Sequence, residues 1–460
     1  MSTEPEPGPQ RGPLAWLRRK LEGRSLIRHV LVLMSGTAVA QLLPILASPI
    51  IARLYTPYDL GVYAAFMSLV GLLTTVASWR YDLAIVRAEK ADDARALVKL
   101  ASRLNATTCV VVGLGLIIAA GPVSEAIGDP GLKPWLAAVG LVAWAYAQVA
   151  IFSYWCNRHV DYHLMSANRV VQSVATTGSQ LAGGAASLGA AGLIGSAFIG
   201  QFVALADMFH RVRKQLLRQP SSSVRRVMVE HKDMPMISAP TAAMDTIRTS
   251  GIQLLISASF SAATLGQFSQ AWRLLQTPMG LITSSLSQVF YQKLATTSRG
   301  EMSRTVLRTV RHAALLGAVP FALIWLLAPP LFPIVFGAPW AQAGLIAAAL
   351  TPWVYVNFVT SPISFLFVVV RRQGMVFWFG VVYTATPLWI IWRLHDDILA
   401  TVTYMSWAMA ALLCCYLGMA LWVARDFDRD GGGQLPHALP PNSEAATEAA
   451  GAPVHRNDDL

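Results

Sequence analysis

Residues 29–52 read HVLVLMSGTAVAQLLPILASPIIA, a long apolar stretch that contains no Asp, Glu, Lys or Arg. A helix needs about 20 apolar residues to cross the hydrocarbon core of a bilayer, because it rises only about 1.5 Å per residue. This stretch is therefore long enough to span a membrane. Comparable stretches recur along the whole chain and predict twelve spans, at 29–52, 60–78, 104–123, 134–155, 165–184, 190–209, 236–258, 264–290, 307–328, 343–369, 374–392 and 398–424.

The composition points to the same class of protein. Of the 460 residues, 54% are hydrophobic and only 13% are charged, whereas a soluble domain carries about 25% charged residues. The 36 Lys and Arg residues outnumber the 25 Asp and Glu residues, which gives a formal net charge of +11. The 33 Gly and 26 Pro residues form no repeat, so collagen-like and wholly disordered proteins are excluded. The chain is expected to be all-α and to span a membrane many times.

The positive charge is distributed unevenly between the connecting segments. Lys and Arg cluster in every second segment, near residues 18–28, 80–103, 158–169, 211–232, 293–311, 371–372 and 425–429. The intervening segments hold only Arg53, Lys133 and Arg393. Positive loops stay in the cytoplasm, so both termini are predicted to be cytoplasmic and the number of spans to be even. The basic N-terminal segment leads into the first span without a small-residue cleavage site, so no cleavable signal peptide is expected.

The two halves of the chain share a weak internal repeat. The sequence LGVYAA at 60–65 resembles LGQFSQ at 265–270, and TAVAQ at 37–41 aligns with TAAMD at 241–245. The two offsets are 205 and 204 residues, and both first spans of the halves contain proline. We expect two six-helix bundles around a central cavity, related by an axis along the membrane normal. The predicted boundaries are 1–28 (cytoplasmic segment), 29–209 (first bundle), 210–235 (basic linker), 236–424 (second bundle) and 425–460 (disordered cytoplasmic tail).

Several motifs resemble those of a known family. The segments SGTAVAQ (35–41), ARLYTP (52–57), DLG (59–61) and RYDLAIV (80–86) look like the start of Wzx-type lipid-linked oligosaccharide flippases, and VFGAPWA (335–341) and TPW (351–353) add to the likeness. These flippases are polysaccharide biosynthesis proteins of the multidrug/oligosaccharidyl-lipid/polysaccharide exporter superfamily. The likeness covers about residues 29–424.

The resemblance implies a function as well as a fold. It implies a bacterial inner-membrane protein that moves undecaprenyl-pyrophosphate-linked oligosaccharides outward by alternating access, for O-antigen, capsule or exopolysaccharide. Its partners would be the lipid-linked oligosaccharide, membrane lipids and other polysaccharide assembly proteins, with neither nucleic acid nor nucleotide. It implies no cofactor, only a coupling ion, H⁺ or Na⁺. In agreement, the chain lacks the phosphate-binding loop G-x-x-x-x-G-K-[ST] of an ATPase.

Charged residues inside predicted spans are the first candidates for cargo binding, because a buried charge is costly and usually faces an interior. They are Asp245, Arg248, Arg273 and, at the edge of the first span, Arg53. Asp245 and Arg248 are three residues apart and can pair on one helix face. They could line a cationic cavity for pyrophosphate or form a structural ion pair, and Arg53 could simply reach the membrane interface. Asp245 could also bind the coupling ion.

A polar stripe on the fifth span gives a second set of candidates. Asn168, Gln172, Thr176, Ser179 and Gly183 recur every three to four residues on an otherwise apolar helix. Such a stripe avoids lipid. It could line the cavity, where amides and hydroxyls bind sugar, or bond a neighbouring helix.

Other functions remain to be weighed against flipping. An ion-coupled drug exporter of the same superfamily would use acidic residues in its cavity, and Asp245 is the only one placed at mid-membrane. A membrane glycosyltransferase or polymerase would need carboxylates on an outer loop, where only Asp396 and Asp397 occur, in a very short turn. The sequence shows no catalytic constellation and no metal-ligand spacing among its four cysteines, so we expect neither an enzyme nor a metal site.

Overall fold

The computed structural model describes residues 36–216, 222–296, 300–364, 366–370 and 372–429, and these residues form helices and turns without a strand. The predicted disordered tail lies almost wholly outside the described residues. The first helix is described from Gly36 to Leu54. The elements that follow are α2 (Pro57–Ala77), α3 (Tyr81–Arg87), α4 (Ala91–Ile118), α5 (Ala120–Ala126), η1 (Pro130–Trp135), α6 (Leu136–Arg158), α7 (Tyr162–Ala185), α8 (Ala190–Leu216), α9 (Val224–Glu230), η2 (Met234–Ser238), α10 (Ala239–Ser259), α11 (Ala262–Thr296), α12 (Met302–Phe336), η3 (Ala338–Trp340), α13 (Ala341–Thr360), η4 (Ser361–Ile363), α14 (Leu366–Val369), α15 (Gln373–Arg393) and α16 (Ile398–Arg429).

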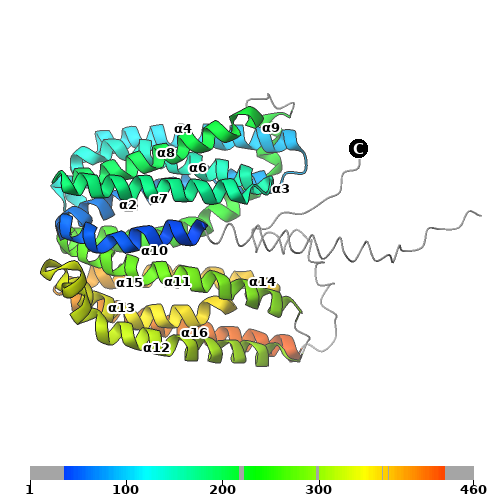
Figure 1. Cartoon of the computed structure of the whole chain (residues 1–460). Helices are drawn as coiled ribbons and strands as arrows, with labels where there is room; N and C mark the ends of the chain where they lie inside the picture. Colours follow the sequence, from blue (N-terminus) through cyan, green and yellow to red (C-terminus); the bar gives the residue numbers. More distant parts are fainter. Residues whose placement is uncertain (1–35, 217–221, 297–299, 365, 371, 430–460) are drawn as a thin grey trace, which may run out of the picture.

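The predicted all-α, multi-span fold is confirmed. Each of the twelve predicted spans overlaps one long helix, and nine helices in the described part of the chain are long and apolar enough to cross a membrane. The long helices that miss this hydropathy threshold are α7, α10 and α11, which carry the most polar residues. Figure 1 shows α4, α6, α7 and α8 on one side and α11, α12, α13 and α16 on the other, with the first helix (dark blue) and α10 between them.

The helix α2 begins where local sequence chemistry dictates. Thr56 accepts a hydrogen bond from the backbone N–H of Asp59 (3.2 Å), and Asp59 Oδ2 accepts one from the backbone N–H of Thr56 (3.0 Å). This capping box, followed by Pro57 at the first helical position, fixes the helix start. In the other half, Ser261 Oγ accepts from the N–H of Thr264 (3.1 Å) at the start of α11. Thr56 and Ser261 are 205 residues apart, which is the offset of the sequence repeat.

The two halves meet where α2 and α11 pack against each other. Gly61 of α2 lies against the backbone carbonyl of Ala262, and Gly266 of α11 lies against the carbonyl of Pro57. Small residues permit this approach of two helix backbones. On another side, α2 packs antiparallel to α10, with Ser68 donating to Gln253 (3.0 Å) and Thr75 bonded to Thr246 (2.9 Å).

At this end of the bundle, called here the Tyr55 end, each half also covers the first helix of the other half. Trp340 of η3 donates from Nε1 to the carbonyl of Ala52 (2.7 Å). In the reciprocal position, Gly128 packs on Ser257 near the end of α10, and a Cβ on Gly128 would lie 3.2 Å from the Ser257 carbonyl oxygen. The Tyr55 end is therefore tied together across the two halves.

The opposite end, called here the basic end, carries the clusters of Arg and Lys. Here α3, α9 and the adjoining ends of α4, α6 and α8 enclose a second apolar core around Ile85, Leu97, Trp155 and Met208. In the other half, Asp428 of α16 accepts from the backbone N–H groups at the start of α12. A carboxylate there is favourable because the helix N-terminus carries a partial positive charge.

Candidate functional site

The helix α10 contacts both halves of the molecule, and its faces differ. Thr246 and Gln253 face α2 of the first half. Met244 faces α15 of the second half, where its carbonyl accepts from Thr384 (3.5 Å). Ile247, between these two contact faces, is 45% exposed and faces lipid in a membrane setting. The remaining face, opposite Ile247, points to the interior of the molecule.

This inner face is covered at one end and open at the other. Asp245, Ile252 and Ile256 follow one another at helical spacing and share the face. Ile252 and Ile256, toward the Tyr55 end, are buried at 2% and 0% exposure. The side chain of Asp245, toward the basic end, is 72% exposed. The inner face of α10 is therefore accessible only from the side of the basic end.

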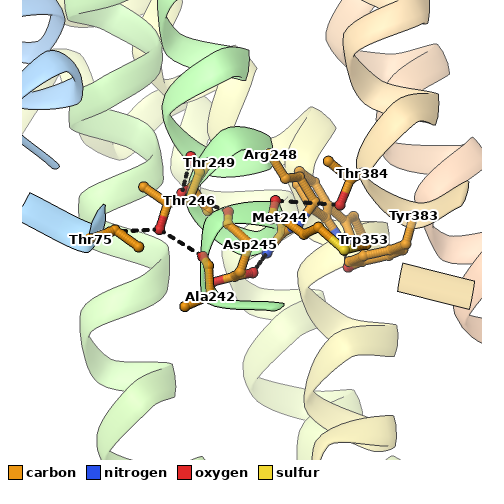
Figure 2. Close-up of polar contacts among 10 residues, drawn as sticks. All are labelled: Thr75, Ala242, Met244, Asp245, Thr246, Arg248, Thr249, Trp353, Tyr383 and Thr384. Carbon is orange, nitrogen blue, oxygen red and sulfur yellow. Dashed lines mark hydrogen bonds and ion pairs between the residues drawn. The ribbon is translucent and has the colours of Figure 1, made fainter. Parts of the chain in front are cut away.

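Asp245 and Arg248 form the central ion pair of this face. An oxygen of Asp245 lies 2.5 Å from Nη2 of Arg248. The two side chains differ strongly in exposure, because that of Arg248 is only 13% exposed. Its guanidinium lies over the ring of Tyr383 at 5.0 Å and 6.0 Å from the ring of Trp353, within the range of cation–π attraction. Figure 2 shows these two rings on the opposite side of α10 from Thr75.

The rings beside Arg248 belong to a connected aromatic group in the second half. Trp353 Nε1 donates to the hydroxyl of Tyr383 (2.7 Å). The ring of Trp353 also contacts that of Trp272 at 4.9 Å, which in turn stacks on Phe268 at 5.9 Å. The Trp353 backbone N–H donates to Ser406 (3.1 Å). Bonds from three helices thus hold the surroundings of Arg248 in one arrangement.

Arg273 of α11 presents a different kind of charge. It is half-buried, its Nη2 donates to Oε1 of Gln270 (2.9 Å), and Tyr63 of α2 lies within electrostatic range. Among the described residues, no carboxylate lies within ion-pair distance of its guanidinium. Arg273 is 273 − 262 = 11 residues into α11, or about 16 Å from the Tyr55 end of that helix. It therefore carries an uncompensated positive charge near mid-membrane depth.

Arg53, the fourth charged candidate, lies away from these residues. Its Nη2 reaches the carbonyls of Ile334 and Val335, both at 3.4 Å, at the C-terminus of α12. A cation is favourable there because the last carbonyls of a helix lack partners within it. Arg53 therefore bridges the two halves at the Tyr55 end.

The polar stripe of α7 bonds the neighbouring helix α8. Asn168 donates to the carbonyl of Ala204 (2.8 Å), and Gln172 donates to Oε1 of Gln201 (2.5 Å). Thr176 packs against Gly200, where a Cβ would lie 1.8 Å from its hydroxyl oxygen. All three candidate side chains thus have partners on α8, far along the chain from Asp245.

The aromatic partners of the site were not identified from the sequence. Tyr383 and Trp353 lie 135 and 105 residues after Arg248, and single aromatic residues in apolar spans give no signal of a site. Gln270 was also missed, although its position three residues before Arg273 places it on the same helix face. The described residues hold no cluster of three or more His, Cys, Asp or Glu that could bind a metal ion.

Comparison with known proteins gives a family and a fold. Residues 50–344 match the family model described as polysaccharide biosynthesis protein. No curated protein matches the sequence. Among solved structures, the lipid II flippase MurJ in an inward closed conformation has a TM-score of 0.67 at 13% identity, with 86% of this chain and 90% of that chain covered. An inward-facing multidrug resistance MATE family transporter of the MOP superfamily has a TM-score of 0.65 at 13% identity, covering 85% and 96%.

A MOP superfamily transporter from Pyrococcus furiosus, whose title reports a binding pocket of reverse polarity, has a TM-score of 0.53 at 13% identity, covering 87% and 96%. At these identities the structural likeness establishes the fold alone. The family model covers well over half of the chain. The chain belongs to the polysaccharide biosynthesis protein family, and its fold is that of MOP superfamily flippases and transporters.

Proposed function

We propose that this protein flips an undecaprenyl-pyrophosphate-linked oligosaccharide across the bacterial inner membrane for surface polysaccharide assembly. In this proposal the halves 29–209 and 236–424 rock against each other and expose the inner face of α10 alternately to each side. The basic end would face the cytoplasm, with both termini, as the distribution of Lys and Arg predicts. The present arrangement, tied at the Tyr55 end, is then the one that loads cargo from the cytoplasm.

The observation that carries this proposal is the uncompensated charge of Arg273. A guanidinium without a carboxylate is costly in the membrane interior and is retained where an anion completes it. Its planar array of donors matches the oxygens of a phosphate group. Gln270 and Tyr63 lie beside it and add neutral polar groups to the same place. A pyrophosphate is the anion that a polysaccharide biosynthesis protein of this fold is expected to carry.

The exposed carboxylate of Asp245 favours one rival function, the export of organic cations. An acid on an inner helix face attracts cations, and the same fold occurs in multidrug resistance transporters. The two functions differ in which charge is essential. A flippase needs Arg273, whereas a cation exporter needs Asp245 and would work without Arg273.

A deletion strain tests the proposal. Cells that lack the protein, and have no second gene of this family, should accumulate lipid-linked oligosaccharide in the cytoplasmic leaflet and lose surface polysaccharide. Complementation with Arg273→Ala should leave this defect, while Arg273→Lys, which keeps the charge but not the fork of donors, should restore it in part. Lipid intermediates are measured by mass spectrometry after extraction, and the level of each variant by immunoblotting of membranes.

The control variant is Arg393→Ala, which removes an exposed arginine at the Tyr55 end. It should complement fully. Unaltered surface polysaccharide in the null strain, or full complementation by Arg273→Ala, would contradict the proposal. If the null strain instead retained more ethidium, and Asp245→Asn failed to lower it, the cation exporter would be the better description.

A further inference from the structure

We infer that Asp245, and not Arg248, is the group that meets the sugars of the cargo, and that the site therefore selects neutral or amino sugars over acidic ones. This inference rests on the proposed flippase function and refines it. It starts from the unequal exposure of the two members of the ion pair. Of Asp245 and Arg248, the carboxylate has 72% of its side-chain surface exposed and the guanidinium 13%.

The exposed side of the pair lies where cargo would pass. Asp245 occupies the inner face of α10, whose continuation at Ile252 and Ile256 is buried. The flanks of the helix are covered by α2 and α15. A molecule that enters from the basic end along this face meets the carboxylate before it can reach the guanidinium.

Arg248 is covered by groups that an anion would have to displace. One side of its guanidinium is bonded to Asp245, and Tyr383 and Trp353 lie over its face. Tyr383 is itself held by the hydrogen bond from Trp353. A phosphate or sugar carboxylate would have to break the ion pair and move a ring before it contacted Arg248. The pair is therefore charge-compensated, with its negative side turned to the interior.

Arg273 and Asp245 then divide the recognition of one cargo molecule between them. Asp245 is 259 − 245 = 14 residues from the end of α10, or about 21 Å along the helix, compared with about 16 Å for Arg273 along α11. The two helices are joined by the turn at the Tyr55 end, so the residues lie at similar depth. Arg273 supplies the unpaired positive charge for a pyrophosphate, and Asp245 supplies acceptor oxygens for the attached sugars.

The chemistry of the carboxylate sets the selectivity. An ionised carboxylate only accepts hydrogen bonds, so it can bind sugar hydroxyls and, more strongly, an ammonium group. It repels the carboxylate of a uronic acid, and like charges brought together at an interface cost several kcal/mol. We therefore expect transport to be fastest for amino sugars, slower for neutral sugars and slowest for acidic sugars.

The test uses the purified full chain in proteoliposomes and three synthetic polyprenyl-pyrophosphate trisaccharides. These differ only in the terminal sugar, which is a hexose, a hexosamine with a free amino group, or a hexuronic acid. Transport is followed by oxidation of the terminal sugar with external periodate, which does not cross the bilayer. We expect the wild-type protein to move the hexose form about tenfold faster than the hexuronic acid form.

Variants separate the role of Asp245 from that of its partner. Asp245→Asn removes the exposed charge and leaves Arg248 uncompensated, so the preference should reverse in favour of the acidic form. Asp245→Asn combined with Arg248→Gln removes both charges and should bring the hexose and hexuronic acid rates close together. Asp245→Glu should keep the wild-type order, as should the control Asp396→Asn, which removes an exposed carboxylate in the turn before α16.

Each outcome bears on a definite claim. If the wild-type protein moved the acidic form as fast as the neutral form, or if Asp245→Asn left the ratio unchanged, the inference would be wrong and the flippase function would stand. If the wild-type protein moved none of the three lipids, the flippase function and the inference would fall together.

Discussion

Gly61 of α2 and Gly266 of α11 occupy equivalent positions in the two halves, and each lies against the start of the other's helix. A Cβ built on Gly61 would lie 1.6 Å from the carbonyl oxygen of Ala262, and one on Gly266 would lie 1.8 Å from that of Pro57. Both glycines and both carbonyls are 205 residues apart. The two repeats thus meet at the Tyr55 end in a reciprocal contact that leaves no room for a side chain.

The first prediction concerns this contact. Gly61→Ala or Gly266→Ala would place a methyl group against backbone, which cannot move aside as a side chain can. Overpacking of this kind costs about 1–3 kcal/mol, so we expect the Tyr55 end to open about tenfold more often. Maleimide labelling of Ala52→Cys, a position 4% exposed at this end, should accelerate in a background without the native cysteines.

Gly115→Ala is the matched control, because nothing lies within 4 Å of a Cβ at this position of α4. If Gly266→Ala labelled no faster than Gly115→Ala, the reciprocal contact would not govern closure of this end.

The second prediction concerns Arg53, which we propose acts as a latch between the halves and not as a cargo ligand. Arg53→Gln should weaken the link to Ile334 and Val335 at the C-terminus of α12, worth about 1 kcal/mol for a partly exposed charged donor. Spin labels at Lys133 and Arg393, which are exposed in opposite halves at the Tyr55 end, should then report a broader distance distribution. Transport of lipid-linked oligosaccharide would change in rate but not in its preference among sugars.

Arg53→Lys supplies the comparison for this variant, because it keeps a donor and a charge near the same carbonyls. It should give a distance distribution between those of the wild type and Arg53→Gln. A changed sugar preference in Arg53→Gln would show that Arg53 contacts cargo.

The third prediction concerns the aromatic cover of Arg248. Tyr383→Phe removes the acceptor of the Trp353 hydrogen bond (2.7 Å) but keeps a ring over the guanidinium. It should lower the free energy of unfolding by about 1 kcal/mol and leave the preference against acidic sugars in place. Tyr383→Ala removes the ring as well and uncovers Arg248, so the preference against acidic sugars should weaken. Equal preferences in the two variants would mean that the ring does not shield Arg248.

The sequence predicted the fold further than the site, and particular residues show why. Span length and the alternation of basic loops depend on local composition, so all twelve long helices could be located, including α7, α10 and α11 with their polar faces. The pairing of Asp245 with Arg248 was also predictable, because both lie on one helix turn. The cover over Arg248 was not, because Tyr383 comes from α15 and only tertiary packing brings its ring to α10. Exposure of Asp245 likewise depends on how the two halves are placed.

The last prediction concerns the polar stripe of α7, whose side chains bond α8. Gln172 donates to Gln201, and Gln201 donates in turn to the carbonyl of Ala145 on α6 (3.2 Å). Gln172→Leu would leave the buried Gln201 Oε1 without its donor, at a cost of about 1–3 kcal/mol. Replacing both residues by Leu removes the donor together with its acceptor, and the pair of apolar side chains should restore part of that loss. Thermal unfolding in a defined detergent, followed by circular dichroism, measures the cycle. A double variant less stable than the sum of the single ones would show that these amides do not act as a pair, and a transport defect in Gln172→Leu at normal stability would return the stripe to the cargo path.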